Sequence, residues 1–114
     1  MREKSADPIA KASFIEKLQQ EGAQELGRFV VLKYSKGGTD SVHGAFIVSA
    51  KVGPSVVRNK VKRRLREIFR NKLVNILEPG FFLFIAKKCI VEAKFDRLEK
   101  DILDIILRIS ENRR

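Results

Sequence analysis

The segment PSVVRNKVKRRLREIFRNKLVNILEPGFFLFIAKK (54–88) decides the fold that this sequence predicts. Gly53-Pro54 breaks the chain before it, and Ser55 is expected to cap the helix that follows. Pro79-Gly80 should end this helix before an unbroken apolar run at 81–88, which is typical of a central strand covered on both faces. The helix is predicted from apolar residues at helical spacing, namely Val57, Val61, Leu65, Ile68, Phe69, Leu73 and Ile76.

Two more strands and a short helix are expected before this segment. RFVVLKY (28–34) is β-branched and aromatic, and the strand from His43 to Lys51 should pair with it antiparallel. The loop between them contains Gly37-Gly38, which favours a turn. Residues 9–20 carry Phe14 and Leu18 four apart and predict an amphipathic helix that stops at Gly22.

A closing helix is expected after the central strand. Its apolar face would be Phe95, Leu98, Ile102, Ile105, Ile106 and Ile109, and its carboxylates Asp96, Glu99, Asp101, Asp104 and Glu111 are expected to form a solvated acidic face rather than a catalytic pair. The resulting order is α-β-β-α-β-α, an α+β fold with a mixed sheet packed by helices. We expect one compact domain over 1–114, with 1–8 flexible.

The composition points to a polyanionic partner. Lys and Arg total 24 against 14 Asp and Glu, a net charge of +10, so the chain repels itself unless a polyanion offsets the charge. No apolar stretch approaches spanning length, so a membrane partner is not expected. A single cysteine, Cys89, cannot form an internal disulfide, and we expect it to be a packing thiol in a cytoplasmic protein. With His43 as the one histidine, no Cys/His metal site is expected.

Most of the charge lies in one segment. Between Lys51 and Lys72 there are nine basic residues and one acid, Glu67, so this segment carries +8 of the net +10. At about 100° per residue, part of it projects opposite the apolar face. We call that part the outer stripe: it consists of Asn59, Arg63, Arg66 and Arg70, with Lys60 and Lys62 at its edges.

Such a stripe has two explanations, a solvated surface or a phosphate-binding surface. Like charges at i,i+4 destabilise a helix, and a solvated face normally intersperses Glu, which is almost missing here. Arginine binds phosphate oxygens bidentately, and each neutralised phosphate releases counterions. Nucleic acid is therefore the favoured partner, although charge alone does not separate RNA from DNA.

The residue pattern of the segment distinguishes RNA from DNA as the expected partner. SAKVGPSVVRNKVKRRLREIFR (49–70) closely resembles the signature of the bacterial ribonuclease P protein family, with eleven matches over twenty-two positions at the family's spacing. The matches are Ser49, Lys51, Gly53, Val56, Arg58, Asn59, Lys62, Arg63, Arg66, Glu67 and Arg70. Ala50, Ser55, Phe81 and Lys87 depart from the usual pattern, which leaves the affinity at the sheet edge open.

The resemblance implies a fold like that of the second domain of ribosomal protein S5, and a subunit of a ribonucleoprotein that removes the 5′ leader of precursor tRNA. No catalytic residue is then expected in this chain, Mg²⁺ should be held chiefly by the RNA, and no obligate protein partner is indicated. The residues implied to contact the ribonuclease P RNA are Lys51, Arg58, Asn59, Lys60, Lys62, Arg63, Arg66 and Arg70.

The resemblance also implies a leader-binding cleft between the first helix and the sheet. Our candidates for it are Phe14, Leu18, Phe29, Leu32, Phe46 and Val48, together with Lys51. Aromatic rings can stack on unpaired bases, but an aromatic residue at helical spacing can equally be core. Tyr34 could likewise contact phosphate or simply pack, and His43 is expected in a solvated turn.

Two other functions stay open at this stage. A ribosomal-type RNA-binding protein would carry the same charge without any turnover. A DNA-binding module could insert the helix into a major groove, although a helix between two strands of one sheet fits the usual docking motifs poorly.

Overall fold

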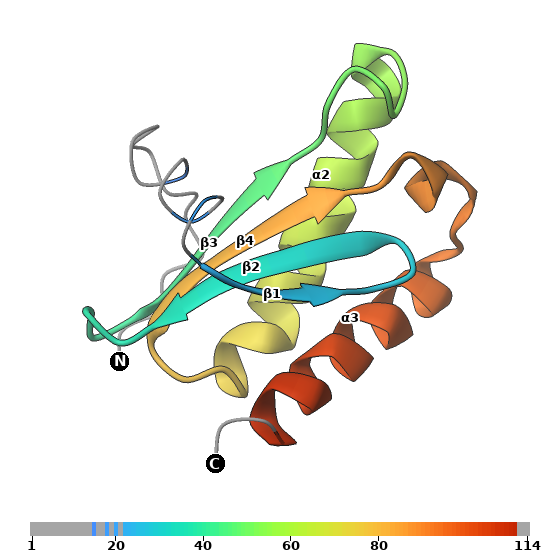
Figure 1. Cartoon of the computed structure of the whole chain (residues 1–114). Coiled ribbons are helices and arrows are strands. Elements are labelled where there is room, and N and C mark those ends of the chain that lie inside the picture. The colour runs from blue at the N-terminus through green and yellow to red at the C-terminus, as the bar shows by residue number, and fades with distance from the viewer. Residues whose placement is uncertain (1–14, 16–17, 19, 21, 112–114) are drawn as a thin grey trace.

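The structure, a computed structural model, describes residues 15, 18, 20 and 22–111 (Figure 1). Ile15, Leu18 and Gln20 are helical, while Phe14, the rest of the expected helix at 9–20 and the expected flexible segment 1–8 lie outside the described residues. The elements are strands β1 (Ala23–Leu26), β2 (Val30–Lys36), β3 (Val42–Ile47) and β4 (Gly80–Ala86), helices α2 (Ser55–Asn71) and α3 (Phe95–Glu111), and 3-10 turns η1 (Leu73–Asn75) and η2 (Lys88–Glu92).

The four strands form one mixed sheet in the order β1-β2-β4-β3. β4 pairs antiparallel with β2 and parallel with β3, so α2 is the crossover between two parallel neighbours. The apolar run predicted as a strand at 81–88 is a central strand, although β4 ends at Ala86 and Lys88 already belongs to η2. Only the centre of the sheet buries both faces of such a strand. The single α+β domain with a mixed sheet is confirmed.

One predicted pairing is wrong. The strands predicted at 28–34 and 43–51, which the structure has at Val30–Lys36 and Val42–Ile47, do not form a hairpin, because β4 lies between them. The loop that joins them straddles the start of β4: Gly37 N donates to Pro79 O at 3.0 Å, and Gly80 N donates to Ser41 O at 3.0 Å. Gly37 and Gly38 do supply the turn, with φ of 84° and 76°. β1, which pairs antiparallel with β2 at the sheet edge, was not predicted, because its AQEL sequence has no apolar alternation.

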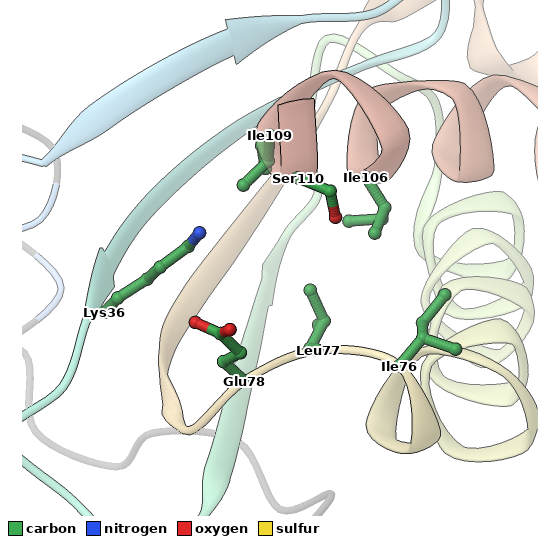
Figure 2. Close-up of a pocket in the computed structure, with 7 residues that line it drawn as sticks. All are labelled: Lys36, Ile76, Leu77, Glu78, Ile106, Ile109 and Ser110. Carbon is green, nitrogen blue, oxygen red and sulfur yellow. The ribbon is translucent and has the colours of Figure 1, made fainter. Parts of the chain in front are cut away.

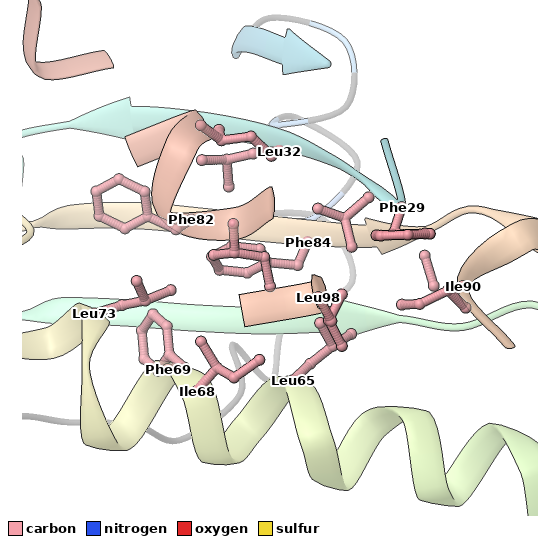
Figure 3. Close-up of a cluster of buried hydrophobic side chains, with 14 of the residues drawn as sticks. Phe29, Leu32, Leu65, Ile68, Phe69, Leu73, Phe82, Phe84, Ile90 and Leu98 are labelled. Carbon is pink, nitrogen blue, oxygen red and sulfur yellow. The ribbon is translucent and has the colours of Figure 1, made fainter. Parts of the chain in front are cut away.

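Helices α2 and α3 cover the same face of the sheet (Figure 1). Their buried residues meet the side chains that alternate onto that face of the strands, and Figure 3 shows Phe69, Leu65 and Leu98 converging on Phe82 and Phe84. Phe69 packs edge-on against Phe84 with ring centroids 6.0 Å apart. This helix-covered face contains most of the hydrophobic core.

The second face of the sheet carries a smaller cluster. Leu18, which is 3% exposed, packs with Ala45 and Leu83, and Ile47 and Ile85 border them. Gly22 N donates to Leu18 O at 2.9 Å, so the chain turns at Gly22, where the expected stop lies. Leu18 therefore lies against the face of the sheet opposite α2 and α3.

Both predicted ends of α2 need correction. Ser55 is the first helical residue rather than the cap, since Pro54 occupies the cap position and no side chain caps the helix. The helix ends at Asn71, so Leu73 is buried through η1 while Ile76 is 55% exposed. Figure 2 shows Ile76 beside Leu77, Ile106 and Ile109 around a gap of about 80 Å³, which is too small for a nucleotide.

Three smaller predictions are also wrong. Cys89 is exposed, and its Sγ donates to the backbone oxygen of Arg28 at 3.3 Å instead of packing in the core. His43 lies in β3 rather than in a turn, and its ring stacks on Phe81 with centroids 5.0 Å apart. Asp101 is not simply solvated, since it accepts two backbone N–H bonds from the β1–β2 turn.

Candidate nucleic-acid interface

Helix α2 is held against the sheet by one apolar side. Val61, Leu65, Ile68 and Phe69 are buried on it. The Phe69 ring sits directly over Gly44 of β3, where a Cβ atom would come within 2.6 Å of the ring. Gly44 therefore lets α2 approach the strand closely, and the helix is fixed in rotation about its own axis.

That rotation turns the outer stripe away from the sheet. Asn59, Arg63 and Arg70 are exposed and Arg66 is partly buried, while every buried residue of α2 lies on the opposite side. Within the described part of the chain, none of the three arginines forms an ion pair. The stripe thus presents guanidinium groups at i, i+3 and i+7 that no carboxylate neutralises.

The edges of the stripe differ in exposure. Lys60 is exposed, whereas Lys62 is partly buried. Arg64, further round the helix, turns inward, and its Nη1 donates to the backbone oxygen of Ala93 at 3.4 Å. Lys72, just past the end of α2, pairs with Glu99 of α3 at 3.5 Å, so this charge is partly neutralised within the chain.

Arg58 has a structural contact as well as a predicted RNA contact. Its Nε donates to the backbone oxygen of Gly53 at 3.0 Å, which joins the first turn of α2 to the loop before it. That loop is itself tightened by a bond from Val52 N to Ser49 O at 3.0 Å. The Nε atom is one of five guanidinium donors, so the two Nη groups of Arg58 keep their capacity for phosphate. Lys51 is exposed in the same loop.

The predicted leader-binding residues are not brought together. Leu32 is fully buried, and Phe29 and Val48 are 9% and 7% exposed in the core of the helix-covered face. Phe46 also points to that face, where it packs against Phe69 and Phe84 with ring centroids 5.7 Å away from each. Leu18 lies on the opposite, second face, and Phe14 is outside the described residues. Because neighbouring strand residues alternate between faces, choosing Leu32 and Phe46 selected the wrong side of the sheet.

The second face carries residues that our sequence analysis missed as candidates. Phe81 is partly buried there and stacks on His43, and Lys33 lies on the same face of β2. The period-two alternation of a strand places residues 81, 83 and 85 on one face. The run FFLF is apolar at every position, however, so the sequence does not show which face is exposed. Tyr34 belongs to the helix-covered face, where it stacks on Phe82, and burial raises the pKa of its hydroxyl.

Among the described residues, no group of three or more His, Cys, Asp or Glu side chains is arranged to hold a metal ion. The same residues include no helix long and apolar enough to cross a membrane.

Comparison with known proteins identifies relatives of this chain. The family model described as Ribonuclease P matches residues 4–110. A ribonuclease P protein component from Caldanaerobacter subterraneus subsp. tengcongensis is 35% identical over 102 residues, covering 90% of this chain and 87% of the relative. A second, from Thermus aquaticus, is 40% identical over 84 residues, covering 74% of this chain and 49% of the relative.

Solved structures agree with these sequence matches. The RNase P protein from Thermotoga maritima superposes with a TM-score of 0.77 at 26% identity, covering 94% of this chain and 97% of that one. An RNase P protein from Staphylococcus aureus gives a TM-score of 0.80 at 24% identity, covering 90% of this chain and 94% of that one, and supports the fold.

Proposed function

The chain belongs to the ribonuclease P protein family, and on this premise we propose that α2 binds the RNA subunit of the ribonucleoprotein through its outer stripe. Ribonuclease P is an endoribonuclease ribonucleoprotein, and this chain is its protein subunit, with the catalytic site in the RNA. The side chains of the protein therefore act as binding and positioning groups rather than as nucleophiles or general bases. Family membership also argues against a DNA-binding module and a ribosomal-type protein without turnover.

The observation that carries this proposal is the unneutralised stripe on a helix of fixed orientation. Arg63, Arg66 and Arg70 project from the side opposite the buried residues and, among the described residues, have no carboxylate partner. A phosphate backbone would neutralise them and release counterions, which is the main source of affinity in protein–nucleic acid binding. Because α2 cannot rotate without opening the Phe69 contact over Gly44, the three guanidinium groups are positioned before RNA arrives.

Arg58 and Lys51 extend the stripe toward the loop before α2. The bond from Arg58 Nε to Gly53 holds this guanidinium near the helix N-terminus, and its free Nη groups could bind one phosphate bidentately. Asn59 can add a hydrogen bond to phosphate or sugar from its exposed position. We include Lys60 and Lys62 as charges at the margins of the same surface.

For the substrate, we propose that the single-stranded 5′ leader of precursor tRNA lies along the second face of the sheet. The cleft expected between the first helix and the sheet was given candidates that lie in the core, and this site on the face that Leu18 contacts replaces them. Phe81 and His43 offer a stacked aromatic pair there, and unpaired bases stack on such rings with little sequence preference. Lys33 on the same face can contact the leader backbone.

We further propose that the Mg²⁺ ions of the reaction are held chiefly by the RNA. Phosphate oxygens are the hard ligands that this ion prefers, and a ribonucleoprotein supplies them in quantity. The protein would then assist by screening phosphate charge and by holding the leader. We expect the ribonucleoprotein to act in the cytoplasm.

Reconstitution tests the proposal directly. The protein is mixed with a bacterial ribonuclease P RNA at low Mg²⁺, and 5′ cleavage of precursor tRNA is followed on a gel. We expect the protein to restore cleavage that the RNA alone performs poorly under these conditions. A matched sample of the Arg63→Ala/Arg66→Ala variant should restore less at the same concentration. Well-folded protein that fails to restore cleavage contradicts the proposal.

A further inference from the structure

A second basic site lies away from the outer stripe. Arg28, Lys94 and Arg97 line a hollow of about 270 Å³, completed by Phe29, Glu92 and Ala93, and we call it the basic hollow. Arg28 comes from the turn between β1 and β2, Lys94 directly precedes α3, and Arg97 lies in the first turn of α3. All three cations are exposed, and none forms an ion pair within the described part of the chain.

The turn that carries Arg28 is held from both sides. Asp101 of α3 accepts a bond from Arg28 N and another from Phe29 N, both at 2.8 Å. On the carbonyl side, Lys87 Nζ donates to Gly27 O at 2.6 Å, and Cys89 Sγ donates to Arg28 O at 3.3 Å. Side chains of Lys87, Cys89 in η2 and Asp101 in α3 therefore bond to four backbone groups of one surface turn, which fixes where the Arg28 side chain begins.

The guanidinium of Arg28 also contacts the neighbouring Phe29 ring. Its Cζ lies 5.6 Å from the centroid of the Phe29 ring, in a cation–π arrangement, and both residues line the hollow. Lys94 and Arg97 stand at the helix end that already carries the positive pole of the α3 dipole. Three cations and a helix N-terminus thus raise the potential of one small volume, and Glu92 is the one acid that lines it.

The hollow is joined to α2 through Arg64. The Arg64 Nη1 bond to Ala93 O places this side chain between α2 and a wall of the hollow. Lys60 lies one turn before Arg64 on the same flank of the helix and is exposed. An RNA lying on the outer stripe could therefore continue past Lys60 and Arg64 toward the amino end of α3 without leaving basic surface.

We propose that the basic hollow binds a backbone phosphate of the same RNA subunit that covers α2. Arg28, Lys94 and Arg97 hold the phosphate, while Asp101, Lys87 and Cys89 act as positioning residues for Arg28. This inference rests on the proposed function, because it takes the RNA on α2 to be that subunit. The second contact makes the RNA bridge α2 and α3, so it fixes the orientation of the protein on the RNA as well as adding affinity.

The test compares variants that remove positive charge inside the hollow with a variant that removes it from α3 outside the hollow. Arg97→Gln and Arg28→Gln/Arg97→Gln are measured against Lys100→Gln, because Lys100 is an exposed cation of the same helix outside the hollow that pairs with Asp104 at 3.5 Å. Binding to the RNA subunit alone is titrated at several salt concentrations, without precursor tRNA. Thermal unfolding of each variant checks that the fold is kept.

We expect the double variant to bind the RNA subunit about tenfold more weakly, in line with the loss of one charge-assisted phosphate contact. The slope of log Kd against log salt should fall by about one, and Lys100→Gln should change neither quantity. A double variant that binds the RNA subunit as tightly as Lys100→Gln, with the same salt slope, overturns the inference. Arg63→Ala/Arg66→Ala in the same titration separates the two claims: if it also binds normally, the proposed function of α2 is wrong as well.

Discussion

Helices α2 and α3 have the same length and the same task in folding, yet their outward faces are opposite in character. Each spans seventeen residues and buries an apolar side on one face of the sheet. α2 has seven basic residues and one acid, while α3 has three basic residues and five acids. The apolar sides account for the fold, so the difference between the outward sides must be explained by what they bind.

Several charges of α3 are engaged within the protein. Asp101 holds the β1–β2 turn, Arg108 pairs with Glu25 at 3.0 Å, and Glu99 pairs with Lys72 at 3.5 Å. Arg108 also donates from Nη2 to the backbone oxygen of Leu26 at 2.6 Å, which closes part of the open edge of β1. The outer stripe of α2 has no such internal contacts among the described residues, and this contrast is why we propose it as a binding surface.

The largest effect should come from removing charge on α2. Arg63→Ala/Arg66→Ala is expected to weaken binding to the RNA subunit about a hundredfold, since two charge-assisted contacts are lost. The salt dependence should flatten, whereas the unaltered protein should lose about a hundred- to a thousandfold in affinity between 50 and 200 mM salt if about five phosphates are bound. Filter binding at these salt concentrations measures both. An unchanged slope would mean that the stripe does not touch phosphate.

A stability effect of the next size is expected on α3. Asp101→Asn leaves one oxygen for two backbone N–H groups, so the free energy of unfolding should fall by about 1–2 kcal/mol, seen as a lower Tm. Asp104→Asn is the control, because Asp104 lies in an exposed i,i+4 pair with Lys100 that contributes little. Equal Tm values for the two variants would remove the structural role that we give to α3.

The second face of the sheet supplies a comparison with α2 that depends on the substrate. Phe81→Leu keeps an apolar side chain but removes the ring, and it should weaken binding of precursor tRNA with a long leader about fivefold. Binding of the RNA subunit to the protein should not change, because α2 is untouched. Parallel titrations with long-leader and leaderless substrates give the answer, and equal losses on both would exclude a leader contact.

The smallest effect tests whether the stripe costs stability in the free protein. Arg66→Glu replaces a like-charge i,i+4 neighbour of Arg70 with an attractive one, so the unbound protein should gain a few tenths of a kcal/mol. Urea denaturation at low salt measures this gain. RNA binding by the same variant should become weaker, and a protein that loses stability instead would indicate that Arg66 has a structural role.

Local patterns predicted much of this molecule because they depend on residues close together in the chain. The spacing from Val57 to Phe69 predicted α2 and its buried side, and therefore the direction of the outer stripe. The helical spacing from Leu98 to Ile109 predicted α3 in the same way. The apolar run at 81–88 predicted a central strand, since few positions in a small domain bury a strand on both faces.

The errors came from pairings between distant segments. β4 separates β2 from β3, although the short glycine-containing loop between these two favoured a hairpin. The predicted hairpin was wrong, and the run that begins at Phe81 is apolar at every position. Neither could show which face of the sheet the helices leave uncovered. As a result, Leu32 and Phe46 were assigned to a leader cleft although they belong to the core.

The sequence by itself determined α2, α3, the three longer strands and which side of α2 is charged, and its charge favours a polyanionic partner. The tertiary structure alone decided that Asp101 accepts a hydrogen bond from the turn at Arg28 and that Arg64 donates one to Ala93. It also decided that Arg28 and Arg97 line the same hollow. The physical reason is the range of the forces. Periodic burial acts over a few residues, whereas these contacts join residues up to seventy-three positions apart and exist only once the sheet has ordered its strands.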